Sequence, residues 1–442
     1  MWRKDPLAGP PTGGPFDQKR ECHALCSLDH VVDLELDRQS FAFGLSQKIT
    51  MKTRSLAYFL LIFLLSGCAV SDLFIEKVQV PPKMIRVAVA HDVDTLTLKV
   101  EGPYRIFDGA TGKKLLDGNG LKASLVSCTT KGIQWAEDLF PSTGIRVEAQ
   151  NTAAVFVNGR RYRGTISLVA VGETKITAIN TLELEEYLKG VVSREISDRW
   201  PLEAIKAQAI VARTYTLYIQ EQKKYPLYDL TSDVSSQVYG GQTSEKYRTS
   251  IAVERTKGLV LFYGQEILPA YYHAACGGWT ENVSELWRQD LPPLQGVACA
   301  FCRRSPHAFW KRNLRLKDIQ DKLNARGYTL GLIKEIAVVE RNKSQRIRKL
   351  KITTRDGKEA FISGKDFRNY VGPNLIKSND YAIEMKGYYV DFIGKGWGHG
   401  VGLCQWGANF MARDGFKSEE ILTHYYPGAD ILLYSARAPQ AP

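Results

Sequence analysis

The most restrictive feature of this sequence is a long helical segment, residues 201 to about 223, that is apolar on almost every side. Pro201 stands in its first turn, where a missing backbone N–H does no harm. At 100° per residue, Leu, Ile, Ala and Val side chains cover both flanks and the back of the helix. A helix that is apolar all round is usually buried. We therefore expect a fold in which other elements surround this segment.

Two cations, Lys206 and Arg213, lie seven residues apart within the apolar arc of this helix. One interpretation is that their long side chains carry the charged ends out to water. The other is that they face a cleft and hold a carboxylate or a ligand, because buried cations need anionic partners. The nearest carboxylate in the sequence is Glu195, beside Ile196 and Trp200. Desolvation there would raise the pKa of the carboxyl and let it donate a proton at neutral pH.

The pattern on either side of residue 181 predicts the fold class. Apolar residues alternate with period two over 85–89 and 95–100, and residues 145–181 resemble a β-meander. Beyond them, a short helix over 182–190 with Gly190 as its stop precedes the long one, and helices at about 243–255, 316–326, 364–371 and 405–414 alternate with short strands. This mixture predicts an α+β protein. A β-rich lead-in would span 84–180, and a mixed catalytic core with the long buried helix would span 181–435.

The N-terminal region predicts export. Residues 51–67 join a basic segment to an apolar run and a small-residue ending, as a secretory signal does. Residues 65–68 resemble a bacterial lipobox, which would make Cys68 a lipidated N-terminus followed by a tether over 68–83. The other interpretation of the apolar run is a buried core helix. Because a signal normally starts a chain, residues 1–50 are interpreted as an extension that was wrongly assigned to the gene or that is disordered. Ala69 after the cysteine resembles sorting to an outer membrane, facing the periplasm, if the organism has one.

Charge restricts the possible partners. Residues 1–67 hold eight Lys or Arg and seven Asp or Glu, so residues 68–442 keep 51 and 40 and a net charge of +11. No Lys/Arg tract is dense enough to indicate nucleic acid. For an exported protein this balance favours an anionic envelope polymer or a membrane surface, or else serves general solubility.

Five cysteines besides Cys68 remain in the predicted mature chain, an odd number that cannot pair completely. His273-x-x-Cys276 and Cys299-x-x-Cys302 have the spacing of zinc ligands, and a closed set of this kind is typical of a structural site. His307 is the rival fourth ligand. The alternative in an oxidising compartment is a disulfide.

Several blocks occur in the order found in one known family. They are residues 184–196, 200–215, 233–241, 273–280, 396–408 and 425–428, and the most distinctive is Gly396-Trp397-Gly398-His399-Gly400. These blocks resemble the stage II sporulation protein D / LytB family over about 180–430. The resemblance implies peptidoglycan chemistry: some members are lytic transglycosylases that cut glycan strands, preferably strands stripped of peptides, and others are known only as enhancers of a cell-wall amidase. Some members bind zinc near the His-x-x-Cys region.

The family's catalytic glutamate maps to Glu195, which would act as acid and then as base. A lytic transglycosylase needs only one such carboxyl, whereas ordinary glycosidases use two. Lys206 and Arg213 would then support Glu195 or the sugar. Six further side chains are candidates for binding sugar, or are polar groups satisfied within loops: Ser235, Gln237, Tyr239, Trp397, His399 and Gln405. Three hypotheses follow: a glycan-cleaving enzyme, a non-catalytic activator that holds glycan and stimulates an amidase, and a zinc hydrolase.

Overall fold

The computed structural model describes residues 82–222 and 224–436, all of which belong to one compact unit spanning residues 81–442. The predicted signal over 51–67, Cys68 and nearly all of the tether lie outside the described residues. Within the described part of the chain, no helix is both long enough and apolar enough to cross a membrane.

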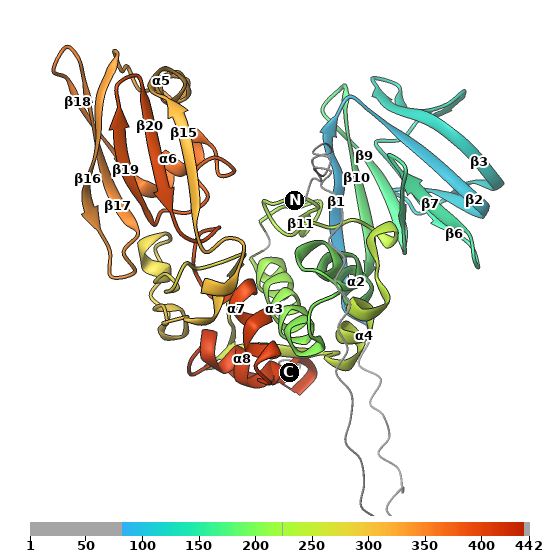
Figure 1. Ribbon diagram of the computed structural model, residues 1–442. Helices are drawn as coiled ribbons and strands as arrows, with labels where there is room; N and C mark the ends of the chain where they lie inside the picture. The colour runs from blue at the N-terminus through green and yellow to red at the C-terminus, as the bar shows by residue number, and fades with distance from the viewer. Residues whose placement is uncertain (1–81, 223, 437–442) are drawn as a thin grey trace, which may run out of the picture. The chain divides into compact units, whose positions relative to one another are not determined.

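The N-terminal part of the described chain is one large sheet with the strand order β11-β1-β10-β9-β6-β2-β3-β4-β5 (Figure 1). β7 adds to β2, and β8 adds to β7. Neighbours are antiparallel except β1 and β11, which run parallel. The bounds are β1 Met84–Val93, β2 Thr95–Asp108, β3 Lys114–Thr129, β4 Gly132–Trp135, β5 Asp138–Phe140, β6 Gly144–Ala149, β7 Ala154–Val157, β8 Arg160–Tyr162, β9 Thr165–Val171, β10 Lys175–Glu183 and β11 Leu230–Thr231.

Helices follow this sheet; the first three share its core, and the last two belong to a separate apolar cluster. They are α2 Leu184–Glu195, α3 Leu202–Glu221, α4 Tyr247–Arg255, α7 Gln405–Arg413 and α8 Ser418–Tyr425. α3 contacts each of the other four helices, and Figure 1 shows it beside α7 and α8. Its buried residues lie on all sides, as the apolar pattern predicted. Since one apolar cluster joins Ile85 and Val87 of β1 to Val191 of α2 and Ile205 of α3, the helices and the large sheet pack as one body.

A second β-rich part, residues 310–394, has its own apolar cluster. It holds two three-stranded sheets, β16-β17-β18 and β15-β20-β19, with the helices α5 and α6. The bounds are β15 Trp310–Arg315, α5 Leu316–Asn324, β16 Ile333–Arg341, β17 Ile347–Thr354, β18 Glu359–Ser363, α6 Gly364–Val371, β19 Tyr381–Lys386 and β20 Tyr389–Gly394. Short strands complete the fold: β12 Leu259–Tyr263, β13 Glu266–Ile267, β14 Tyr272–His273, β21 Leu403–Cys404 and β22 Asp430–Leu433. The α+β class is confirmed.

One predicted boundary is wrong, and the error bears on the site. Gly190 does not end its helix, because α2 continues to Glu195. A Cβ at Gly190 would lie 2.5 Å from Cε2 of Tyr239 and 3.0 Å from the Gly241 carbonyl oxygen. Glycine is therefore required here for the close approach of a neighbouring loop rather than for a helix stop.

Candidate functional site

Glu195 is the last residue of α2, and the loop that Gly190 admits brings it a hydrogen-bond donor. The Gly240 N–H donates to the Gly190 carbonyl oxygen at 3.3 Å, and the Ser244 hydroxyl donates to the same oxygen at 3.0 Å. This docking places the Val238 N–H 3.1 Å from Oε1 of Glu195. The carboxyl is thus fixed at the junction of a helix end and a loop, and it stays partly exposed.

The surroundings of Glu195 favour its protonated form. Burial raises the pKa of this carboxyl, while hydrogen bonds from the Val238 N–H and from the side chains of Tyr272 and Gln405 act in the opposite direction. Because Glu195 lies at the C-terminal end of α2, the partial negative charge of the helix end also disfavours the ionised form. A raised pKa is what a carboxyl needs to donate a proton near neutral pH.

Three tyrosines surround the carboxyl. Burial, together with the charge of Glu195, raises the pKa of Tyr187, Tyr215 and Tyr272. All three phenols therefore stay neutral at physiological pH and keep an O–H that can donate. A carboxyl with a raised pKa among neutral phenols is a site that can exchange a proton with an oxygen atom and hold neighbouring hydroxyl groups.

Tyr272 belongs to β14, one of a short pair of parallel strands, and Gln405 begins α7 directly after the other strand, β21. β14 pairs with β21 so that Tyr272 lies opposite Leu403 and His273 opposite Cys404. His399 supports this pair: its Nε2 donates to the Tyr272 carbonyl oxygen at 2.9 Å, and its Nδ1 accepts from the Val401 N–H at 3.1 Å. Burial lowers the pKa of His399 to about 4, so the ring is neutral. His399 thus contacts the backbone that carries Tyr272.

Among the predicted sugar-binding residues, Gln237 and Tyr239 are buried and bonded inside the protein. The amide of Gln237 bridges Tyr187, Thr216 and the Ala212 carbonyl oxygen. The Tyr239 hydroxyl donates to Asn180 at 3.0 Å. Gln237 thus connects the loop before Gly240 to α2 and α3, and Tyr239 connects the same loop to β10.

The other predicted residues lie in different surroundings. Ser235 is exposed, three residues before the Val238 N–H that binds Glu195. Trp397 is partly exposed and lies between the His307 ring, at 4.8 Å, and the Lys377 ammonium, at 4.9 Å. Gln405, which lies beside Glu195, also donates to Gln208 at 3.3 Å.

The two cations of α3 have carboxylate partners of their own. Arg213 is fully buried and forms a two-pronged ion pair with Glu185, at 2.7 and 2.9 Å. It also donates to the carbonyl oxygens of Val253 and Leu259, at 3.2 Å each. Lys206 pairs with Glu203 at 2.9 Å on a partly exposed flank. The structure therefore places Arg213 as an internal tie between α2, α3 and α4.

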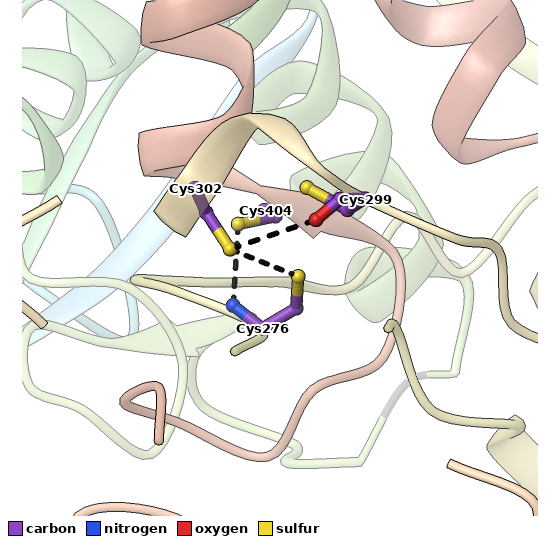
Figure 2. A group of neighbouring side chains, drawn as sticks. All are labelled: Cys276, Cys299, Cys302 and Cys404. Carbon is purple, nitrogen blue, oxygen red and sulfur yellow. Dashed lines mark hydrogen bonds between the residues drawn. The ribbon is translucent and has the colours of Figure 1, made fainter. Parts of the chain in front are cut away.

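A second group of side chains lies close to this site and consists of four cysteines that point toward one another (Figure 2). The sulfur atoms of Cys276, Cys299, Cys302 and Cys404 all lie within 4.8 Å of one another, and all four residues are buried. The cysteines that the structure describes are free thiols. Tetrahedral zinc with Zn–S bonds of about 2.3 Å separates its sulfurs by roughly 3.8 Å. The donor set and spacing therefore fit such an ion.

Backbone groups also fit a metal-bound thiolate. Sγ of Cys404 accepts from the N–H groups of Cys276 and Gly407, at 3.2 and 3.3 Å, and it caps the start of α7. The positive end of a helix dipole favours a thiolate at this position. Hydrogen bonds from neighbouring thiols lower the pKa of Cys302, while burial raises that of Cys404.

The membership of this group differs from the zinc site predicted from spacing. Cys404 replaces His273, whose Nδ1 lies 3.1 Å from the Val401 carbonyl oxygen. His307 packs against Trp397 and Trp406 and is not one of the four. Cys404 was overlooked because it lies about a hundred residues from the other three and has no paired cysteine near it. The two-residue parallel pairing of β14 with β21 brings Cys404 to the other three cysteines, and residue spacing does not reveal that pairing.

Other residues around Glu195 also escaped the sequence interpretation. Tyr187, Tyr215 and Tyr272 belong to or adjoin the quoted blocks, but nothing in their spacing assigned them to Glu195. The Val238 N–H carries no side-chain signal at all. Only the fold brings these groups together.

Two family profiles and several known proteins match this chain. A family profile described as "Stage II sporulation protein" matches residues 172–263, which include Glu195. A second, described as "Domain of unknown function (DUF8618)", matches residues 302–402. An uncharacterized protein of Brachyspira hyodysenteriae is 30% identical over 354 residues, which cover 80% of this chain and 94% of that protein.

Two named relatives extend this match. The stage II sporulation protein D of Bacillus subtilis is 28% identical over 307 residues, covering 65% of this chain and 87% of that protein. The amidase enhancer of Bacillus subtilis is 26% identical over 338 residues, covering 66% of this chain and 47% of that protein. The resemblance drawn from the sequence blocks is confirmed, and the chain belongs to the stage II sporulation protein D / LytB family.

Proposed function

We propose that this protein is a lytic transglycosylase that cuts the glycan strands of peptidoglycan, with Glu195 as its acid and base. The observation that carries the proposal is the environment of one carboxyl: Glu195 is partly exposed, its pKa is raised by burial, and Val238, Tyr272 and Gln405 fix it in place. A cell-wall function agrees with the family and with the named relatives.

One carboxyl can perform both proton transfers of such a reaction. Protonated Glu195 gives its proton to the glycosidic oxygen as the bond from muramic acid to glucosamine breaks. The resulting carboxylate then takes the proton from the 6-hydroxyl of the muramyl ring, and the oxygen closes the 1,6-anhydro ring. No water enters the products, so a second carboxylate that activates water is not needed. The neutral phenol of Tyr272 donates a hydrogen bond to Glu195 and stabilises the carboxylate formed midway.

The test is a digest of purified glycan strands stripped of peptides. Wild-type protein should release fragments with 1,6-anhydromuramyl ends, detected by mass spectrometry. Glu195→Gln should lower the rate by roughly 10²–10⁴-fold, which is the usual contribution of general acid–base catalysis. Glu173→Gln, an exposed carboxylate in a turn, is the matched control and should leave the rate unchanged. Newly formed reducing muramic acid ends in place of anhydro ends would mean hydrolysis and would refute the proposal.

A second candidate function is supported by one relative, the amidase enhancer of Bacillus subtilis. In that case the protein would hold glycan and stimulate a separate cell-wall amidase. If neither wild type nor Glu195→Gln cuts glycan and both increase amidase turnover equally, this function replaces the first.

We further propose that the four-cysteine group binds structural zinc. Four thiolates close the coordination shell and leave no open position for substrate. The ion would stabilise the fold where β14, β21 and the start of α7 meet. Protein prepared without added zinc should contain one zinc per chain, released by a thiol reagent and not by mild chelation alone. Absence of metal, with the four cysteines of this group all titratable as free thiols, would exclude the zinc site.

We also propose export and lipid anchoring at Cys68, from the signal pattern of residues 51–67. Labelled fatty acid should enter the wild-type protein and not the Cys68→Ala variant. Incorporation into both would place the anchor elsewhere, and incorporation into neither would refute it.

A further inference from the structure

A cavity of about 550 Å³ lies away from Glu195, where the second β-rich part meets the segment around η2 (Val283–Glu285). Its walls come from the end of β16, from β17 and β18, from the start of α6, and from residues 281–286. This volume is in the usual range for small-molecule sites. Most of the β-rich wall falls within residues 302–402, the part matched by the domain of unknown function.

The charges on these walls do not cancel. Arg348 forms ion pairs with both Glu285 and Glu340, at 3.4 and 2.9 Å. The Glu281 carboxylate accepts hydrogen bonds from Asn342, Ser344 and its neighbour's N–H. The three acidic residues of the cavity are therefore each held by partners within its walls.

Two lysines of the cavity have neutral partners instead. The Lys349 ammonium lies 4.5 Å from the ring centre of Phe361, and the Lys365 ammonium donates to the Leu286 carbonyl oxygen at 2.8 Å. Among the described residues, no carboxylate oxygen lies within 4.0 Å of either ammonium. With Arg346 and Arg348, the two lysines make four cations against three carboxylates, so the cavity walls carry a net charge of +1, beside the half-exposed apolar face of Phe361.

The deeper wall contains polar atoms that need a partner. Arg346 is 2% exposed and uses its two terminal nitrogens on the carbonyl oxygens of Cys276 and Trp279, at 2.7 and 3.0 Å. Within the described part of the chain, neither its Nε nor Oδ1 of Asn379, which is 8% exposed, has a hydrogen-bond partner. Buried polar atoms are nearly always bonded to protein, water or ligand. Both residues line the cavity, so water or a ligand held there can supply these bonds.

We propose that this cavity binds a carboxylate-bearing fragment of the cell wall, held by Lys349 and Lys365. The inference rests on the proposed function for its choice of wall material, and on the net positive charge and the unbonded Arg346 Nε, a donor, for its choice of a carboxylate. The Asn379 oxygen, an acceptor, would take a water or a hydroxyl of the same fragment. Two sources share this chemistry. Muramic acid in strands stripped of peptides exposes a lactyl carboxylate, and the stem peptide carries carboxylates of its own.

The test measures binding without cleavage, using the full chain with Glu195→Gln. Isothermal titration would use three probes: a peptide-free glucosamine–muramic acid oligomer, a free stem tripeptide, and a chitin oligomer that has no carboxylate. At least one of the two carboxylate probes should bind, with an affinity that depends on Lys349 and Lys365. The carboxylate probe that binds more tightly identifies the source.

Two pairs of lysine substitutions test whether the probe binds in the cavity. Adding Lys349→Ala with Lys365→Ala should weaken the bound probe about tenfold or more, since each bond to a charged group contributes appreciably. The matched control, Lys322→Ala with Lys334→Ala, removes two exposed charges of the same β-rich part outside the cavity and should change affinity less than twofold.

The outcomes separate this inference from the proposed function. It is overturned if neither carboxylate probe binds, if the chitin oligomer binds with the same dependence on the lysines, or if the cavity pair behaves like the control pair. A wild type that fails to cut glycan, with lysine-dependent binding intact, would refute only the cleavage.

Discussion

Replacing Arg213 by methionine separates the two interpretations that the sequence left open for this cation. The side chain is fully buried and holds Glu185 with two hydrogen bonds and two carbonyl oxygens with two more. Removing one partner of a buried ion pair costs about 3–5 kcal/mol, because the other charge is left uncompensated. Glu185 keeps some contact with water, at 14% exposure, and the Gly258 N–H, at 3.2 Å. We therefore expect a loss near the lower end, about 3 kcal/mol.

Urea unfolding followed by fluorescence measures this loss, and Lys206→Met is the matched control on the same helix. Lys206 pairs with Glu203 where both side chains are more than a fifth exposed, so its loss should cost less than about 1 kcal/mol. If Arg213 and Glu185 act as one unit, the double variant with Glu185→Met should lose less than the sum of the single losses. In folded protein, Arg213→Met should bind glycan as wild type does. Unchanged stability with lost glycan binding would refute the structural role and support the cleft interpretation.

Four further predictions concern the Glu195 site and the four-cysteine group. The pKa of Glu195 is raised in the folded protein above its unfolded value of about 4.3, so ionising this carboxyl costs stability as the pH rises from the unfolded pKa through the folded pKa. Glu195→Gln should therefore raise the melting temperature at pH 7 and not at pH 4. An equal shift at both pH values would contradict the raised pKa. Cleavage by wild type should decline on the alkaline side as this carboxyl ionises, and a rate that keeps rising to pH 9 would exclude Glu195 as the acid. Cys404→Ser should reduce the zinc content measured by mass spectrometry while His273→Ala keeps it, and the reverse would restore the predicted ligand set. Gly190→Ala should lower the melting temperature and cleavage together, since its Cβ would meet the Tyr239 ring at 2.5 Å, and wild-type values for both would contradict that contact.

The sequence was most informative where one segment determines its own environment. The apolar pattern of residues 201–223 predicted a buried helix, and α3 is buried on all sides. Local patterns failed where distant segments meet. Gly190 resembles a helix stop when only its neighbours are considered, yet its missing Cβ serves a loop fifty residues away. Likewise, the side chains that hydrogen-bond to Glu195 come from β14 and α7, which no spacing rule connects to it.

The four-cysteine group and the Glu195 site share the same two short strands. Tyr272 and His273 form β14, and Leu403 and Cys404 form β21. On β14, Tyr272 bonds to Glu195 and Cys276 follows four residues later; on β21, Cys404 is a member of the group and Gln405 is the next residue. A displacement of Cys276 or Cys404 would therefore disturb the backbone that carries Tyr272 and Gln405, the two side chains that hydrogen-bond to the carboxyl. A metal bound there would stabilise the fold and also hold the surroundings of Glu195 in place.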